Sequence, residues 1–98
     1  MSPHHTDSIK RLFQALLLLE NEEECSAFLE DLCPIRELQD LSQRLEVAQL
    51  LKSQATYTEI VEKTGVSTAT IGRVNRALNY GAGGYQRVWE KCKGNTDK

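Results

Sequence analysis

The sequence predicts an all-α fold for its 98 residues. Apolar residues recur at intervals of three or four over long stretches, which places them on one face of a helix. Capping side chains of the kind that begin helices precede several of these stretches. No run of alternating β-branched residues is present, and glycine and proline do not occur at hairpin spacing. The length fits one domain over residues 1–98, with a thin core.

The N-terminal half predicts three helices. The first covers residues 7–20, where the apolar spacing is helical. The second covers residues 22–32 and follows Asn21 and Glu24, a variant of the capping box. Pro34 suits the first turn of a third helix, whose apolar series runs from residue 35 to residue 51. This third helix is apolar on so much of its surface that we expect neighbours to cover it on several sides.

Residues 56–78 carry the pattern of a helix-turn-helix. Thr56 and Glu59 form a capping box that starts a short helix at about residue 57. Gly65 ends it where a left-handed residue is favoured, and Ser67 caps a second helix that continues to about residue 78. Two short helices joined by a glycine turn define this motif. The side chains expected to face the core are Ile60, Val61, Val66, Ile71, Val74 and Leu78.

The opposite face of the second helix suits a DNA major groove. Small residues at its start allow close approach of the backbone, hydroxyls form hydrogen bonds, and arginines bind guanine edges or phosphates. The candidate DNA-binding residues are Ser67, Thr68, Ala69, Thr70, Gly72, Arg73 and Arg76. The plainer alternative is a well-capped helix of a small bundle, with solvated arginines. Residues 81–84 then predict a flexible connector before a short amphipathic helix over residues 85–93.

Charge is divided unevenly along the chain, whose net charge is −2. Residues 1–40 carry three basic and nine acidic side chains, a net charge of −6. Residues 41–98 carry nine basic and five acidic side chains, a net charge of +4. Such asymmetry favours an acidic partner for the basic half, although solvated helix faces also show it.

Other function classes lack the residues they need. The cysteines, Cys25, Cys33 and Cys92, are an odd number at wide spacings, which fits a reducing cytoplasm. Neither they nor His4 and His5 have the spacing of metal ligands, so no metal site is predicted. No acid, base and nucleophile occur together, so the sequence predicts no catalytic residues and no enzyme. The apolar run at residues 16–19 is far too short to cross a membrane.

Residues 35–80 resemble the trp repressor family of bacterial transcription regulators. The resemblance rests on V-x-x-L-L at 47–51, E-I-x-x-x-x-G at 59–65 and A-T-I-x-R-x-N-x-x-L at 69–78. The acidic N-terminal half and the G-G-Y ending also resemble the trp-repressor-related proteins of Gram-positive bacteria. The resemblance implies an intertwined homodimer, with residues 7–53 as dimerisation helices and two helix-turn-helix heads on double-stranded DNA with a palindromic operator.

The resemblance also implies roles for individual residues. The family's DNA contacts fall on Thr68, Ala69 and Thr70, with Gly72 where the family has a threonine. The family's co-repressor pocket gives a candidate ligand pocket, made of Gln43, Arg44, Arg73 and Val74.

Two of these pocket positions depart from the family. Gln43 stands where the family has a carboxylate-binding arginine, with Arg44 one residue away, and a neutral amide cannot form that pair. Val74 replaces a glycine that leaves room for an indole ring. We therefore predict no cofactor and no response to tryptophan, leaving open an unidentified small-molecule effector.

The predicted function is a sequence-specific DNA-binding transcriptional regulator, a repressor. The alternative is a helical protein–protein interaction module with a vestigial helix-turn-helix, which the acidic half and the leucine-rich first helix support.

Overall fold

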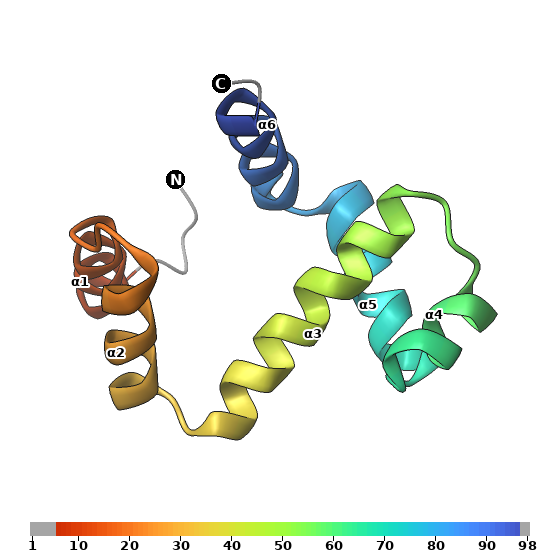
Figure 1. Ribbon diagram of the computed structural model, residues 1–98, viewed down its shortest axis with the longest axis horizontal. Coiled ribbons are helices and arrows are strands. Elements are labelled where there is room, and N and C mark those ends of the chain that lie inside the picture. Colours follow the sequence, from red (N-terminus) through yellow and green to blue (C-terminus); the bar gives the residue numbers. More distant parts are fainter. Residues whose placement is uncertain (1–5, 97–98) are drawn as a thin grey trace. The chain divides into compact units, whose positions relative to one another are not determined.

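The computed structural model describes residues 6–96 and confirms the all-α prediction, with no strand among these residues (Figure 1). Within them the chain forms six helices. They are α1 (Asp7–Leu17), α2 (Glu22–Leu32), α3 (Ile35–Lys52), α4 (Tyr57–Thr64), α5 (Thr68–Tyr80) and α6 (Gly84–Thr96). His4 and His5 lie outside the described residues. None of the described helices is long and apolar enough to span a membrane.

The helices form two compact units, and the boundary between them lies inside α3, between Leu38 and Gln39. The first unit contains α1, α2 and the start of α3, and the second contains the rest of α3 with α4, α5 and α6. All the buried apolar residues of the described chain belong to the second unit. That unit therefore has a core of its own.

In the first unit, α1 is shorter than the sequence predicts. Its N-terminus is capped by the hydroxyl of Thr6, and it ends at Leu17 rather than at residue 20. The N–H of Leu18 donates to the carbonyl of Ala15 at 3.1 Å, a tight final turn that closes the helix. No proline or glycine marks this end, so the apolar spacing alone overestimated the length.

Helix α2 has the predicted bounds and a modified capping box. The side-chain oxygen of Asn21 accepts a hydrogen bond from the N–H of Glu24 at 2.8 Å, as the sequence indicates. The carboxylate of Glu24 accepts in return from the N–H of Glu20, at 2.9 Å, and not from that of Asn21. Neither α1 nor α2 contains a buried residue, and Leu17 is 84% exposed.

The core of the second unit consists of Val47, Ala48, Ile60, Val66, Ile71 and Val74. Helix α3 supplies only the first two of these. Its other predicted apolar positions are less covered, since Leu41 and Leu45 remain 49% and 43% exposed in the chain by itself. The structure thus leaves part of the apolar surface of α3 open.

A glycine-rich connector joins α5 to α6. A side chain at Gly81 would collide with the carbonyl oxygen of Ala77, so only glycine fits there. Gly83 has φ +81°, a left-handed conformation that glycine adopts without strain. Helix α6 begins at Gly84 and continues beyond the predicted end at residue 93.

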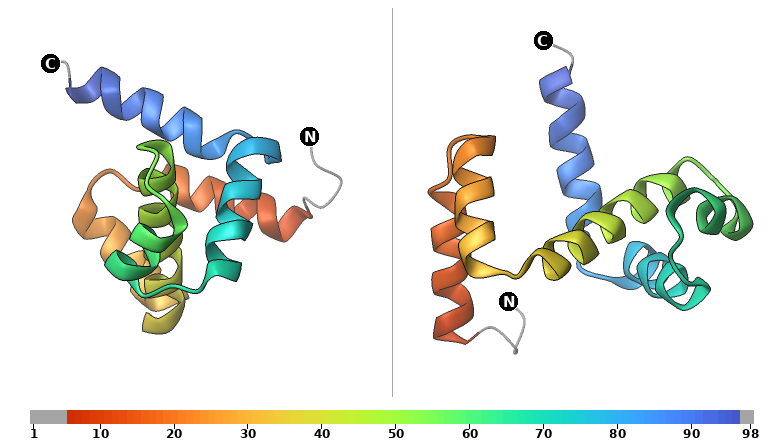
Figure 2. Two further views of the ribbon diagram at one scale, coloured as in Figure 1. Left: turned by 90° about the vertical axis from the view of Figure 1, so that its right-hand side faces the viewer. Right: turned by 60° about the horizontal axis from the view of Figure 1, so that its bottom comes forward.

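Helix α6 is attached to the end of α3 through aromatic side chains. The ammonium of Lys52 lies 4.6 Å from the ring centroid of Trp89 and donates to the side-chain oxygen of Gln86 at 3.1 Å. Tyr85 stacks on Trp89 with ring centroids 5.9 Å apart. The start of α6 accordingly lies alongside α3 (Figures 1 and 2).

Candidate nucleic-acid interface

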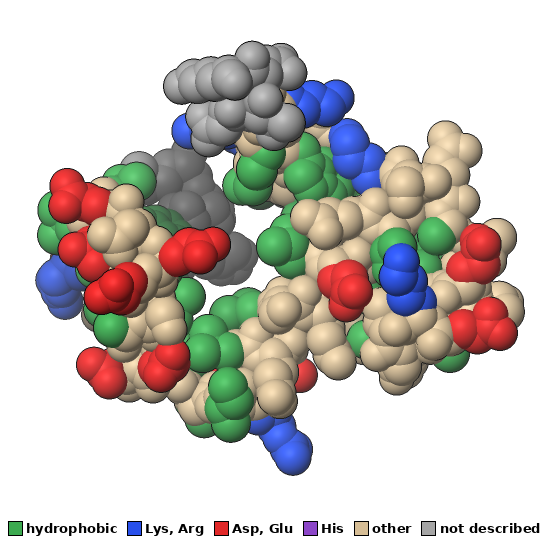
Figure 3. Space-filling model, viewed as in Figure 1, with side chains coloured by type: hydrophobic (Ala, Val, Ile, Leu, Met, Phe, Trp, Pro, Cys, Tyr) green, Lys and Arg blue, Asp and Glu red, His purple; other side chains and the backbone are tan. Residues whose placement is uncertain are grey.

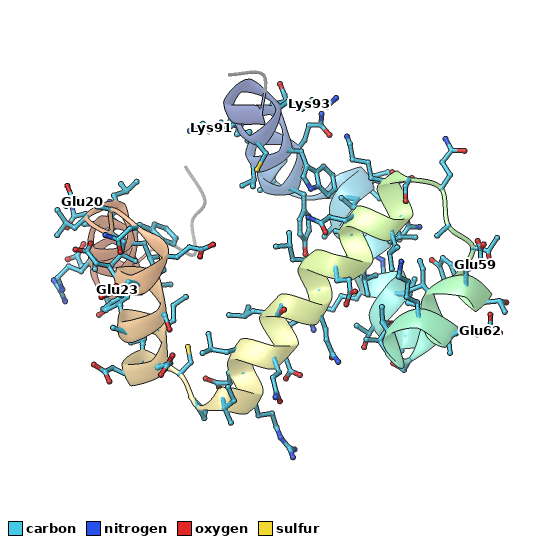
Figure 4. The ribbon with its side chains drawn as sticks, in the orientation of Figure 1. Glu20, Glu23, Glu59, Glu62, Lys91 and Lys93 are labelled. Carbon is cyan, nitrogen blue, oxygen red and sulfur yellow. The ribbon has the colours of Figure 1, made fainter. Side chains whose placement is uncertain are left out.

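A reciprocal capping box starts α4, as the sequence predicts. The hydroxyl of Thr56 accepts from the N–H of Glu59 at 3.2 Å, and the carboxylate of Glu59 accepts from the N–H of Thr56 at 2.7 Å. Hydrogen bonds from the backbone and then the side chain of Thr56 lower the pKa of Glu59. Glu59 and Glu62 both point outward from α4 (Figure 4).

The capping box makes α4 sensitive to acid. Because folding lowers the pKa of Glu59 below its ordinary value of 4.5, its contribution to stability is complete above that value. The contribution is lost as the pH falls through the lowered pKa. Glu59→Gln keeps a hydrogen-bonding side chain without a titrating carboxyl, so we expect its melting temperature to fall less in acid than that of the wild type.

Circular dichroism melting between about pH 7 and about pH 3 measures this difference. Glu62→Gln is the matched control, since Glu62 is exposed on the same helix and takes no part in the cap. Equal acid sensitivity of the wild type and Glu59→Gln would contradict the prediction.

The turn between α4 and α5 is built from local hydrogen bonds. Gly65 has φ +75°, the left-handed conformation predicted for this position, and its N–H donates to the carbonyl of Val61 at 2.8 Å. The hydroxyl of Thr64 donates to the carbonyl of Ile60 at 2.7 Å and accepts from the N–H of Val66 at 3.2 Å. The hydroxyl of Thr64 and the N–H groups of Gly65 and Val66 are thus all paired within the turn.

The start of α5 is capped by the hydroxyl of Ser67. This oxygen accepts from the N–H of Thr70 at 3.2 Å and lies 3.1 Å from the hydroxyl of Thr70. The predicted cap is therefore confirmed. The helix continues to Tyr80, two residues further than the sequence predicts, and Gly81 then ends it.

The inward face of the helix-turn-helix is the one that the sequence predicts. Four of its six expected members are buried and two are half-buried. The buried ones are Ile60, Val66, Ile71 and Val74, and the half-buried ones are Val61 and Leu78. Because this set joins α4 and α5 to α3, the outer face of α5 is held at a fixed orientation within the second unit.

The predicted DNA-binding residues lie on the outer face of α5 and its cap. Exposed members are Ser67, Thr68, Ala69, Arg73 and Arg76, while Thr70 and Gly72 are half-buried. No aspartate or glutamate occurs between Glu62 and Glu90, so this surface meets no carboxylate of its own helix. Carboxylates are instead numerous on α2, which carries five of them (Figure 3).

The predicted ligand-pocket residues separate into two groups. Gln43 and Arg44 of α3 line a polar pocket of about 160 Å³ together with Asp40 and Thr70. Val74 instead lies in the core with 2% of its surface exposed, and neither it nor Arg73 lines this pocket.

Asp40 and Thr70 line this pocket as well, although the resemblance implies no ligand role for either. Sequence spacing could have indicated Asp40, because it lies three residues before Gln43 and four before Arg44, which places all three on one face of the helix. The approach of Thr70 depends on how α5 packs on α3, which no local pattern shows.

Comparison with known proteins decides the family. The family model described as Trp repressor protein matches residues 7–93. The chain belongs to the Trp repressor family. It is 48% identical to the uncharacterized protein YerC of Bacillus subtilis (strain 168) over 85 residues, which are 87% of this chain and 82% of YerC.

Solved structures of Trp repressor-like proteins share the fold. A TrpR like protein from Eubacterium eligens ATCC 27750 is 53% identical, with a TM-score of 0.86 over 90% of this chain and 91% of that one. A putative Trp repressor from Staphylococcus aureus is 44% identical, also with a TM-score of 0.86, over 91% of this chain and 89% of that one. The predicted resemblance is confirmed, and membership of the Trp repressor family indicates a DNA-binding regulator rather than an enzyme.

Proposed function

We propose that the protein is a sequence-specific transcriptional repressor that reads its operator with the outer face of α5. The observation that carries this proposal is the composition of that face. It presents Ser67, Thr68, Arg73 and Arg76 to solvent, on a helix whose opposite side is buried in the core. Hydroxyl groups and guanidinium groups are the partners that base edges and phosphates prefer. A bacterial regulator of this kind acts in the cytoplasm, where the DNA lies.

A homodimer is part of the proposal. Two exposed apolar surfaces support it, one in each unit. In the first unit, Leu17 and Leu18 are 84% and 77% exposed. In the second unit, Leu45, Tyr85 and Val88 line an apolar groove of about 530 Å³. A second copy of the chain would remove these surfaces from water and place two recognition helices on a palindromic operator, with half-sites about one helical turn apart.

We further propose that the protein acts without tryptophan. The buried Val74 occupies core space, and Gln43 offers no charge for a carboxylate. The pocket that Gln43 lines, about 160 Å³, is smaller than the roughly 300 Å³ at which small-molecule sites begin. Calorimetric titration with L-tryptophan should therefore show no binding, and a micromolar dissociation constant would contradict this part of the proposal.

Selection of bound sequences from a random DNA pool, at a stated salt concentration, tests the main proposal. The expected result is a palindrome with half-sites about one turn apart. Light scattering of the same preparation measures the oligomeric state. A monomer that enriches no sequence would refute the proposal and favour a protein–protein interaction module, whose contact surface would be the exposed leucines of α1 and α2.

A further inference from the structure

We infer that Arg44 of α3 is a further DNA contact, which binds a backbone phosphate beside the recognition helix α5. Asp40, on the same face of α3, weakens this contact. The inference rests on the proposed DNA-binding function and extends it to a second helix. The structural observation that supports it is that Asp40, Arg44 and Thr70 line one polar pocket.

The pocket brings α3 next to the DNA-facing turn of α5. Thr70 belongs to the first turn of α5, and its hydroxyl lies 3.1 Å from that of Ser67. The side chain of Arg44 is half-buried, so neighbouring residues restrict the conformations it can adopt. It lines the same pocket as Thr70. A cationic side chain of α3 is thus placed beside the residues that are proposed to enter the groove.

The chemistry of the pocket fits a phosphate better than a small molecule. At about 160 Å³ it holds little more than a few polar atoms. Arginine remains charged at any physiological pH, and its planar fork matches the oxygens of a phosphate. More than half of the hydrogen bonds between proteins and DNA go to phosphate and sugar, where they fix the register of the protein without reading sequence.

Asp40 is expected to have the opposite effect on DNA binding to that of Arg44. It lies one helical turn before Arg44 on the same face of α3 and lines the same pocket. A carboxylate there repels an approaching phosphate and reduces the local positive potential. Removal of the Asp40 charge should therefore strengthen DNA binding, whereas removal of the Arg44 charge should weaken it.

The experiment compares Arg44→Gln and Asp40→Asn in the full chain. Dissociation constants are measured on the operator selected with the wild type and on a random duplex of equal length, over a range of salt concentrations. Arg44→Gln should weaken binding to both duplexes about ten-fold. Because the proposed homodimer holds two copies of Arg44, the substitution should also reduce the slope of log affinity against log salt by about 1.8, or about 0.9 for each lost phosphate contact. Asp40→Asn should tighten binding to both duplexes about two- to five-fold. Impaired folding would weaken both variants, so opposite signs separate a charge effect from a structural one.

Two control variants carry the same charge changes elsewhere. Arg36→Gln and Glu37→Gln alter exposed residues in the first turn of α3. Equal effects in the controls would show that net charge alone is responsible and would overturn the inference. An unchanged DNA affinity of Arg44→Gln would also overturn the inference. A loss of sequence preference at one base position in Arg44→Gln would overturn it too, because it indicates a base contact. A wild type that binds neither duplex refutes the proposed function itself, whereas operator binding with inert Arg44 and Asp40 refutes only this inference.

Discussion

Replacing Ile60 with alanine is expected to lower the free energy of unfolding by about 2–5 kcal/mol. Ile60 is fully buried in α4, in the same cluster as Ile71 and Val74. The substitution removes apolar contacts and leaves a cavity in the core that holds α4 and α5 together. Urea denaturation followed by circular dichroism, at one fixed protein concentration, measures the change.

Two further variants calibrate this result. Ile60→Val removes one methyl group and should cost about 0.5–1.5 kcal/mol. Thr58→Ala alters an exposed side chain of the same helix and should change the free energy of unfolding by less than about 0.5 kcal/mol. A loss in Ile60→Ala no larger than that in Thr58→Ala would show that Ile60 is not in the core.

Replacing Arg73 with alanine is expected to weaken operator binding by about 1–3 kcal/mol, roughly 5- to 150-fold, with the helical circular dichroism signal intact. Arg73 is exposed on the outer face of α5, and its neighbour Val74 is buried in the core. The substitution therefore removes the proposed DNA contact without removing a core contact. Thr70→Ala should also weaken binding, because Thr70 lies on the same face and its hydroxyl is paired with that of Ser67.

The sequence dependence of the loss identifies the kind of contact. If Arg73 reads a guanine, specificity at one operator position relaxes, whereas loss of a phosphate contact weakens all sequences alike. Arg87→Ala is the matched control, since Arg87 is an exposed arginine on α6. Unchanged operator affinity in both Arg73→Ala and Thr70→Ala would refute the proposed recognition face.

The helix-turn-helix could be predicted closely because each of its boundaries has a local cause. Thr56 and Glu59 start α4, Gly65 ends it, and Ser67 starts α5, each through hydrogen bonds or a backbone conformation within a few residues. Such signals depend on residue type and short spacing, which the sequence contains in full. The helical spacing of apolar residues also identified Ile60 and the rest of the inward face.

The ends of other helices depend on causes that spacing does not contain. Leucines continue through residues 16–19, yet α1 ends at Leu17 in a tight turn before Asn21 begins the next helix. Helix α5 extends past its last apolar contact at Leu78 because the exposed residues that follow remain compatible with helix until Gly81. In both cases the apolar stripe and the backbone hydrogen bonds end at different residues.

The surroundings of individual side chains were the least predictable feature. The resemblance implies a common ligand role for Gln43, Arg44, Arg73 and Val74. Packing instead puts Val74 in the core and Arg44 beside Thr70. That arrangement depends on how α5 crosses α3, a contact between residues far apart in the sequence. The role of these residues in ligand or DNA binding stays a prediction.

The absence of buried residues from α1 and α2 has a consequence for the amount of protein in the cell. Helices of this length are marginal in water when no apolar face is covered. If a second copy provides the cover, folding of the first unit and association become one equilibrium, governed by mass action. Dilution would then unfold the first unit as well as separate the subunits. A small fall in expression would then lower the concentration of folded dimer by a larger fraction than the fall in total protein. The abundance of the protein would thereby control how much of the operator is occupied.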